Sequence, residues 1–336
     1  MSTPSPSILI FGATGYIGGA MLMAVLKAFP TAKVSAIVRH NTHDAVLTAA
    51  GVASVLHHDG GSSKADIDAL QNAVSGFDVV VNAADANDVV LVDAIITGLK
   101  ARKERTGKRA VFLHTAGVLV VADAAQGEWD PDFLYISDMD EAALRAIPPT
   151  AINREIELRV YEADAAQHID GYQICPGGVW GTSPDAPVRK DSVRLLQMYR
   201  AVFGKGLVIG SGTNRMATVH VADLADLAVL VLRRALSGAK ASSYGKYYFA
   251  ATSEVQQRDV AAVVVKALVQ LDELDVDVGV KNVSVEEAST HLNYAFALAV
   301  NSAVRAERGL GIGWNPSRLG SSTENMADQL RPIVGV

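Results

Sequence analysis

The chain of 336 residues is 49% hydrophobic and 20% charged, and it contains a single Cys. This length and apolar content suffice for a large core and exclude a disordered chain, a collagen-like repeat and a disulfide scaffold. The net charge of −6, from 30 Lys and Arg against 36 Asp and Glu, argues against a nucleic-acid partner. Because one Cys cannot form an internal disulfide, we expect a reducing, cytoplasmic compartment.

Residues 8–26 carry no charged side chain and are long enough to imitate a membrane span. No Lys or Arg precedes this run, as a signal peptide would require. Glycines at 12, 15, 18 and 19 also interrupt it. We therefore expect a soluble protein with no membrane partner.

Apolar runs alternate with helix-like segments through the first half of the chain. The predicted strands cover residues 8–11, 34–38, 52–56, 79–81, 110–113 and 172–175. The predicted helices between them cover residues 17–28, 44–50, 66–74, 89–102 and 150–166. This alternation indicates a parallel sheet with helices on both faces. The predicted fold class is α/β, a Rossmann doubly wound parallel sheet with a smaller C-terminal substrate lobe.

The second half is less regular. Turn-rich stretches at 181–187 and 204–212 interrupt predicted helices at 191–202, 221–236 and 254–271. We expect a dinucleotide-binding domain over residues 1–175, rejoined at about 213–236. The substrate-binding lobe would then comprise residues 176–212 and 237–336.

Gly12, Gly15 and Gly18 follow the first predicted strand and open the first helix. Glycine at such points permits a tight turn and brings the backbone close to a pyrophosphate. The amide groups at the helix start then face the phosphates. An ordinary glycine-rich turn is the alternative, but the strand–turn–helix context favours dinucleotide binding.

With Thr14 and Tyr16-Ile17, this spacing resembles the extended or atypical branch of the short-chain dehydrogenase/reductase superfamily. The segments DVVVNAAD (78–85), CPGGVWG (175–181) and TVHVADLA (218–225) resemble further elements of that branch. The sequence as a whole resembles fungal-type proteins labelled NAD-dependent epimerase/dehydratase or NmrA-like. The resemblance implies cofactor contacts from Gly12, Thr14, Gly15, Tyr16, Ile17, Gly18, Asp59, Asn82, Ala83, Ala84, Pro176, Gly177 and Val179.

The end of the second strand bears on the choice of nucleotide. NAD enzymes usually place an acid there for the ribose 2′-hydroxyl, whereas this strand ends in Val38-Arg39-His40. Arg39 can pair with a 2′-phosphate through a charge-assisted contact, so NADP(H) is the predicted cofactor. A solvated arginine at a strand end is the alternative.

The catalytic Tyr and Lys that the resemblance implies are missing, because none of the nine Tyr has a Lys four positions later. Thr115 matches the family's hydroxyl residue after the fifth strand, and Tyr135 is a candidate proton donor. Arg154 is a candidate replacement for the Lys charge. A satisfied strand-end Thr, a loop-packing Tyr and a surface Arg are the alternatives. No metal is predicted, since consecutive ligands such as His57-His58-Asp59 rarely converge on one ion.

We expect an NADP(H)-dependent oxidoreductase that reduces a small, largely apolar carbonyl, enone or imine compound. Its pocket would be lined by residues 115–140 and 177–215. One alternative is a non-catalytic NADP(H)-sensing NmrA-like protein, and another is an isomerase, epimerase or cyclase using the same pocket. The expected partner is a small-molecule substrate, with a homodimer left open.

Overall fold

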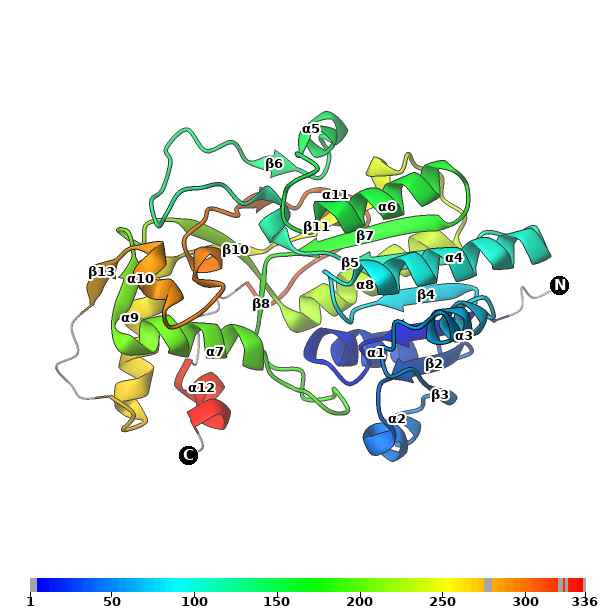
Figure 1. Cartoon of the computed structure of the whole chain (residues 1–336), viewed down its shortest axis with the longest axis horizontal. Coiled ribbons are helices and arrows are strands. Elements are labelled where there is room, and N and C mark those ends of the chain that lie inside the picture. The colour runs from blue at the N-terminus through cyan, green and yellow to red at the C-terminus, as the bar shows by residue number, and fades with distance from the viewer. Residues whose placement is uncertain (1–4, 275–279, 320–322, 324–325, 335–336) are drawn as a thin grey trace.

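A central sheet of parallel strands organises the computed structural model, which describes residues 5–274, 280–319, 323 and 326–334. The seven strands follow the order β11-β7-β5-β4-β1-β2-β3 (Figure 1). Their bounds are β1 (Ser7–Phe11), β2 (Lys33–Val38), β3 (Ser54–His57), β4 (Val79–Asn82), β5 (Val111–Thr115), β7 (Asp170–Pro176) and β11 (Tyr247–Ala250). The order reverses between β1 and β4, as in the doubly wound Rossmann fold, and the predicted fold class is confirmed.

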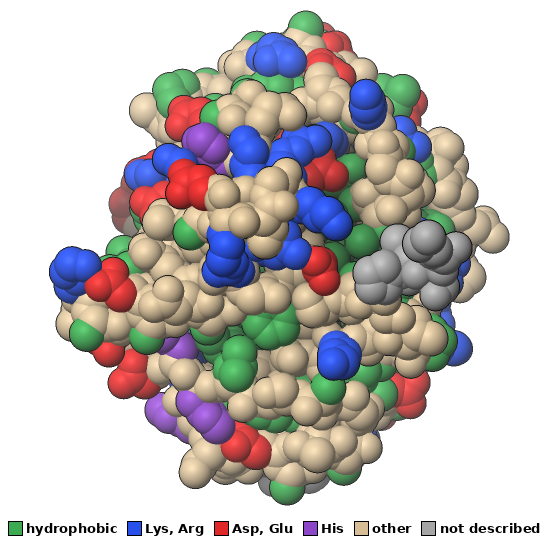
Figure 2. Space-filling model, turned by 90° about the vertical axis from the view of Figure 1, so that its right-hand side faces the viewer, with side chains coloured by type: hydrophobic (Ala, Val, Ile, Leu, Met, Phe, Trp, Pro, Cys, Tyr) green, Lys and Arg blue, Asp and Glu red, His purple; other side chains and the backbone are tan. Residues whose placement is uncertain are grey.

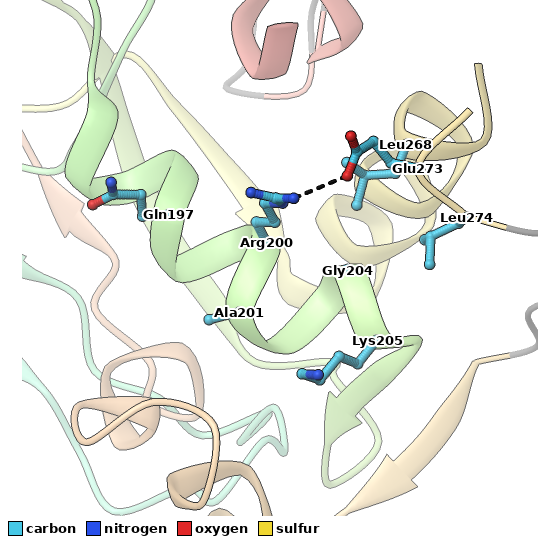
Figure 3. Close-up of a pocket in the computed structure, with 8 residues that line it drawn as sticks. All are labelled: Gln197, Arg200, Ala201, Gly204, Lys205, Leu268, Glu273 and Leu274. Carbon is cyan, nitrogen blue, oxygen red and sulfur yellow. Dashed lines mark hydrogen bonds and ion pairs between the residues drawn. The ribbon is translucent and has the colours of Figure 1, made fainter. Parts of the chain in front are cut away.

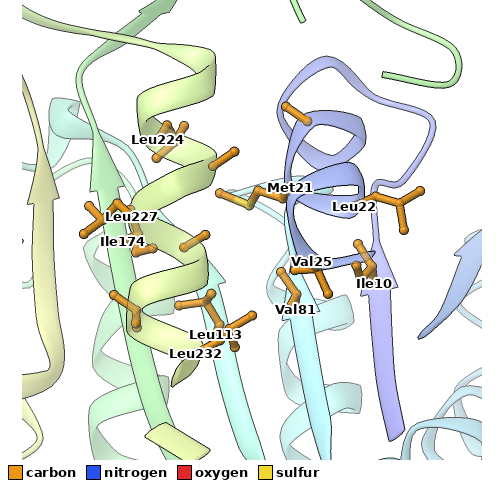
Figure 4. Packing of buried hydrophobic residues seen from close by; sticks show 14 of the residues in the cluster. Ile10, Met21, Leu22, Val25, Val81, Leu113, Ile174, Leu224, Leu227 and Leu232 are labelled. Carbon is orange, nitrogen blue, oxygen red and sulfur yellow. The ribbon is translucent and has the colours of Figure 1, made fainter. Parts of the chain in front are cut away.

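Helices cover both faces of this sheet. On one face lie α1 (Tyr16–Ala28), α2 (Asp44–Ala49) and α8 (Val221–Leu236), and on the other α3 (Lys64–Val74), α4 (Val89–Thr106) and α6 (Arg154–Ala165). Figure 4 shows α1 and α8 packing side by side over the strands, with Leu113 beneath them. The next residue towards the start of that strand, Phe112, belongs to the core of the opposite face, because successive side chains of a strand alternate. Burial on both faces explains the continuous apolar runs.

The uncharged run at residues 8–26 folds as β1, the glycine loop and most of α1. Its apolar side chains enter the core of the sheet, where Ile8, Leu9 and Ile10 are fully buried. Within the described ranges, no helix combines the length and apolar character needed to cross a membrane.

The second lobe has small sheets and a core of its own. Strands β8 (Gly178–Trp180), β10 (Arg215–His220) and β12 (Ser253–Gln256) form one sheet, and β9 (Leu207–Ile209) pairs with β13 (Lys281–Val283). The lobe's helices are α7 (Val193–Val202), α9 (Gln257–Gln270), α10 (Val285–Ser289) and α12 (Met326–Val334). A further pair, β6 (Ile136–Ser137) and β14 (Val304–Arg305), lies near α5 (Glu141–Ala146) and α11 (Arg308–Gly311).

Three elements differ from the sequence-based expectation. The range 254–271 begins as strand β12, antiparallel to β10, before α9 starts. Strand β11 lies in the central sheet although it falls within the range expected for the lobe, because its Tyr-Tyr-Phe-Ala residues are buried beside β7. Helix α6 starts at Arg154 and not at residue 150, after Asn153 adopts a left-handed conformation with φ of 64°.

Basic side chains gather where α4 ends, on the side of the molecule that Figure 2 faces. Lys103 and Arg105 occupy the last turn of α4, where positive charge complements the helix dipole. Arg102 pairs with Asp78, and Arg105 donates to the carbonyl oxygen of Ser75 at 2.7 Å. This basic stretch therefore stabilises the helix end, at the opposite edge of the sheet from the glycine loop.

Candidate functional site

Gly12, Gly15 and Gly18 lie in the turn between β1 and α1, at the carboxyl edge of the sheet. Gly12 has a φ of 79°, and a Cβ placed there would lie 2.3 Å from the carbonyl oxygen of Ala83. A Cβ on Gly18 would lie 2.1 Å from the carbonyl oxygen of Gly12. The loop therefore packs against the end of β4 on one side and against its own helix on the other. Only glycine permits both approaches.

The amino end of α1 is open to an anion. No side chain caps this helix at Gly15, and its first turn contains no acidic residue. The orphan amide groups of a helix start and its dipole both favour a phosphate. Thr14 and Ile17 are half-buried beside these amide groups. The loop thus has the donors and the close backbone packing that a dinucleotide pyrophosphate needs.

Asn82 ends β4 and holds the neighbouring backbone in place. Its Oδ1 accepts the amide hydrogen of Ala84 at 3.2 Å, and its Nδ2 lies 3.3 Å from Nδ1 of His114. Burial lowers the pKa of His114 to about 4, so the imidazole is neutral. This buried pair fixes residues 82–84 against the glycine loop, a role for His114 that sequence reasoning missed.

Tyr16 ties the two halves of the chain together. Its hydroxyl donates to the carbonyl oxygen of Gly181 at 2.7 Å, directly after β8. Burial raises the pKa of this phenol, and the charge of Asp191 raises it further. A Cβ on Gly19 would lie 3.3 Å from Ala186, in the same crossing segment. The side chain of Tyr16 thus anchors residues 181–191 over α1.

Arg39 follows β2 directly and its side chain is exposed. The nearest acid in the sequence, Asp44, lies at the start of α2 and holds His57 Nε2 at 3.0 and 3.1 Å. Asp59 is exposed after β3, where its Oδ1 accepts the amide hydrogen of Gly61 at 2.9 Å. The chain therefore places the exposed, positively charged Arg39 side chain directly after β2. Among the residues that the structure describes, no group of three His, Cys, Asp or Glu side chains is arranged to hold a metal.

Pro176, Gly177 and Val179 mark the exit of the chain from β7 into the second lobe. The Gly177 amide donates to the carbonyl oxygen of Ala250 at 3.0 Å, at the end of β11. A Cβ on Gly177 would lie 2.3 Å from the carbonyl oxygen of Ala217. Val179 is buried in β8, beside Val219 of β10. This crossing brings the second lobe to the carboxyl edge of the sheet.

The three candidate catalytic residues have separate partners. Thr115 is buried at the end of β5, with its hydroxyl 4.0 Å from Sδ of Met21 on α1. The Tyr135 hydroxyl donates to Glu254 at 3.0 Å. Burial raises the pKa of Tyr135, and Glu254 raises it further, against an opposing effect of Arg215.

Arg154 is fully buried and not the surface arginine considered as its alternative. Its guanidinium donates to Glu157 at 2.9 Å and to the carbonyl oxygen of Leu144 at 2.6 Å. The other Glu157 oxygen accepts from the Tyr247 hydroxyl at 2.7 Å. Burial raises the pKa of Glu157 to about 7, although both hydrogen bonds act in the opposite direction. Arg154 thus belongs to a buried polar cluster with Glu157 and Tyr247, next to the edge strand β11.

A pocket of about 360 Å³ opens at the carboxyl end of β11. It is lined by Ala217, Ala251, Thr252, Ser253, Glu254, Val304, Arg305, Ala306 and Glu307. These residues lie outside the ranges 115–140 and 177–215 that sequence reasoning proposed for the pocket. The chain brings them together only through the late pairing of β14 with β6 and of β12 with β10, which no local motif signals.

A second hollow of about 510 Å³ lies in the second lobe, between α7 and α9 (Figure 3). An ion pair of 2.9 Å between Arg200 and Glu273 crosses its rim. Neither its lining nor that of the smaller pocket contains a predicted site residue. The smaller pocket lies at the carboxyl end of β11, at the edge of the sheet that also carries the glycine loop.

No family model matches the chain. Oxidase ucsJ from Acremonium sp is 27% identical over 335 aligned positions, which cover 92% of this chain and 92% of that protein. Vestitone reductase from alfalfa superimposes with a TM-score of 0.60 and 16% identity, over 98% of this chain and 99% of its own. dTDP-glucose 4,6-dehydratase from Bacillus anthracis str. Ames, solved with NAD, superimposes with a TM-score of 0.62 and 13% identity, over 98% of this chain and 97% of its own. The structural similarities confirm the Rossmann-like fold along almost the whole chain.

Proposed function

We propose that this protein is an NADP(H)-dependent oxidoreductase of the atypical extended short-chain dehydrogenase/reductase type. It would reduce a small, largely apolar carbonyl, enone or imine compound. The observation that carries the proposal is the uncapped start of α1, held beside Ala83 by glycines that leave no room for a Cβ. The similarity to an oxidase, and the fold shared with a reductase and with a dehydratase solved with NAD, support it.

The residues present fit a dinucleotide. The amide groups after Gly15 would hold the pyrophosphate, and Arg39 would hold a 2′-phosphate. Asp59 would lie beside the adenine. Residues 82–84, together with Pro176, Gly177 and Val179, would flank the remaining part of the dinucleotide. When bound, NADPH supplies a hydride.

The chain's own part in the reaction is to orient the acceptor and to exclude water. The Thr115 hydroxyl would donate a hydrogen bond to the acceptor oxygen or nitrogen, and water or Tyr135 would then supply the proton. Arg154 is proposed to hold α6 against β11 through Glu157 and Tyr247 and not to contact the substrate, because its side chain is fully buried. We place the enzyme in the cytoplasm, with a small-molecule substrate.

Nucleotide binding tests the first part. The wild-type protein should bind NADPH at least about tenfold more tightly than NADH, since a charge-assisted hydrogen bond contributes about 1.5–3 kcal/mol. Arg39→Asp should abolish this preference. Arg233→Asp, the same change at an exposed arginine near the end of α8, should keep it. Equal affinity for both nucleotides in the wild type would refute the role of Arg39.

Turnover tests the second part. NADPH consumption with a panel of aldehydes, enones and imines should fall in Thr115→Val and Tyr135→Phe, which each remove one hydroxyl. One observation favours the sensor alternative, namely that Tyr135 is bonded to a carboxylate and its pKa is raised. Tight NADPH binding with no consumption on any acceptor would favour the sensor over the reductase.

A further inference from the structure

The pocket at the end of β11 adjoins Gly177, which belongs to the segment proposed to flank the nucleotide. Its lining residue Ala251 follows Ala250, whose carbonyl oxygen accepts the Gly177 amide hydrogen at 3.0 Å. The pocket residues Ala217 and Val304 are buried in the same apolar cluster as Ala116, the neighbour of Thr115. The pocket therefore lies near Thr115 and Gly177, where a substrate of the proposed reaction would bind.

The floor of the pocket is apolar and its rim is charged. Ala217, Ala251, Val304 and Ala306 give the floor, and three charged side chains reach the rim. Both carboxylates of the rim already have hydrogen-bond donors. Glu254 accepts from the Tyr135 hydroxyl at 3.0 Å, and Glu307 accepts from the Ser137 hydroxyl.

Arg305 is the third charged residue of the rim, and no carboxylate of the described residues occupies the N–H donors of its guanidinium. Its guanidinium carbon lies 4.0 Å from the ring centre of Tyr135, so the cation is held over an aromatic face. No carboxylate in the described part of the chain lies within ion-pair distance of it. A guanidinium held over a ring by this cation–π contact keeps its N–H donors for a planar oxyanion, and it loses less side-chain entropy on binding than an unrestrained arginine would.

We propose that Arg305 binds a carboxylate of the substrate. The proposal rests on the proposed function and narrows its substrate class to small organic acids with an apolar body. A carboxylate matches the guanidinium fork in two parallel hydrogen bonds, while the alanine and valine floor accommodates hydrocarbon. A dianionic phosphate is disfavoured relative to a monoanionic carboxylate, because its second negative charge adds to the repulsion from Glu254 and Glu307 in the same lining.

Binding of matched probes tests this site. Calorimetric titrations of the full chain, with and without NADPH, would compare cyclohexanecarboxylate, cyclohexanecarboxamide, cyclohexylmethylamine and inorganic phosphate. We expect the carboxylate to bind at least about tenfold more tightly than the amide, from the strength of charge-assisted hydrogen bonds. Arg305→Gln should remove the difference. Arg305→Lys should keep only part of it, because a point charge replaces the fork.

Arg233→Gln, at the exposed arginine of α8, is the matched control and should bind as the wild type does. Equal affinity for carboxylate and amide in the wild type, no carboxylate binding, or tighter binding of the amine or phosphate would each overturn the proposal. If Arg305→Gln does not fold, a full carboxylate preference in Arg305→Lys overturns it as well. NADPH binding without a carboxylate preference refutes only the Arg305 site. A carboxylate preference without NADPH binding refutes the proposed function and leaves the site standing.

Discussion

The Glu157 carboxylate accepts a hydrogen bond from the Arg154 guanidinium at 2.9 Å, and neither side chain has exposed surface. The pair stands on the helix that, by resemblance, should present a catalytic Tyr and Lys. Because removing water from two charges costs free energy, such a pair stabilises a fold only when its remaining hydrogen bonds are made. Here Tyr247 and the carbonyl oxygen of Leu144 complete most of them.

Arg154→Met should therefore destabilise the protein by about 3–5 kcal/mol, because it leaves Glu157 buried without its main donor. The free energy of unfolding, from urea denaturation, measures the effect. The double variant Arg154→Met/Glu157→Leu should recover much of the loss, since it removes both polar partners. A catalytic Arg154 would instead give lower turnover at unchanged stability.

Glu157 should make stability fall as the pH rises. Its pKa in the folded protein is about 7 against an ordinary value of 4.5, so the folded state keeps a proton that the unfolded state releases. The stabilisation is complete below pH 4.5 and is lost by about pH 7, amounting to about 3 kcal/mol at about 1.4 kcal/mol per pKa unit. Glu157→Gln should remove this dependence in denaturation curves recorded across that range.

His114 should have the opposite effect. Its folded pKa of about 4 lies below the ordinary 6.5, so its contribution is present above pH 6.5 and is lost as the pH falls towards 4. Between about pH 4.5 and pH 6.5, Glu157 lowers and His114 raises the free energy of unfolding as the pH rises. Glu157→Gln should accordingly gain stability with rising pH there, and His114→Asn should lose it. Parallel curves for both variants and the wild type would contradict both assignments.

Gly18→Ala should both destabilise the protein and weaken NADPH binding. Its Cβ would lie 2.1 Å from the backbone of Gly12, so the loop must move, at a cost of about 1–3 kcal/mol. Urea denaturation and nucleotide fluorescence measure the two effects. Gly311→Ala is the control, because nothing lies within 4 Å of a Cβ there. An unchanged affinity in Gly18→Ala would remove the loop from the nucleotide site.

The half of the fold that binds the proposed nucleotide was predictable because its signals are local. Buried parallel strands read as continuous apolar runs, and the close approach of Gly12 to β4 requires a residue without a side chain. Helix α8 was predicted with its observed bounds, from a strong apolar period. The start of α6 was less clear, because Asn153 changes the backbone conformation before the helix begins.

The pocket could not be predicted in the same way. Arg305 and Tyr135 meet across the pairing of β14 with β6, between segments far apart in the sequence. The burial of Arg154 was equally hidden, since an amphipathic helix gives no local sign of an ion pair inside the core. Contacts of this kind depend on tertiary packing, which periodicity does not encode.

The place of β11 in the sheet has a consequence for biosynthesis. As the chain leaves the ribosome, β7 emerges well before its outer neighbour β11, because residues 177–246 lie between them. Until Ala250 has been released, β7 carries an unpaired edge, which is the feature of nascent sheets most prone to pair with other chains. Pausing of translation between β7 and β11 would thus prolong the interval in which the nascent chain depends on chaperones.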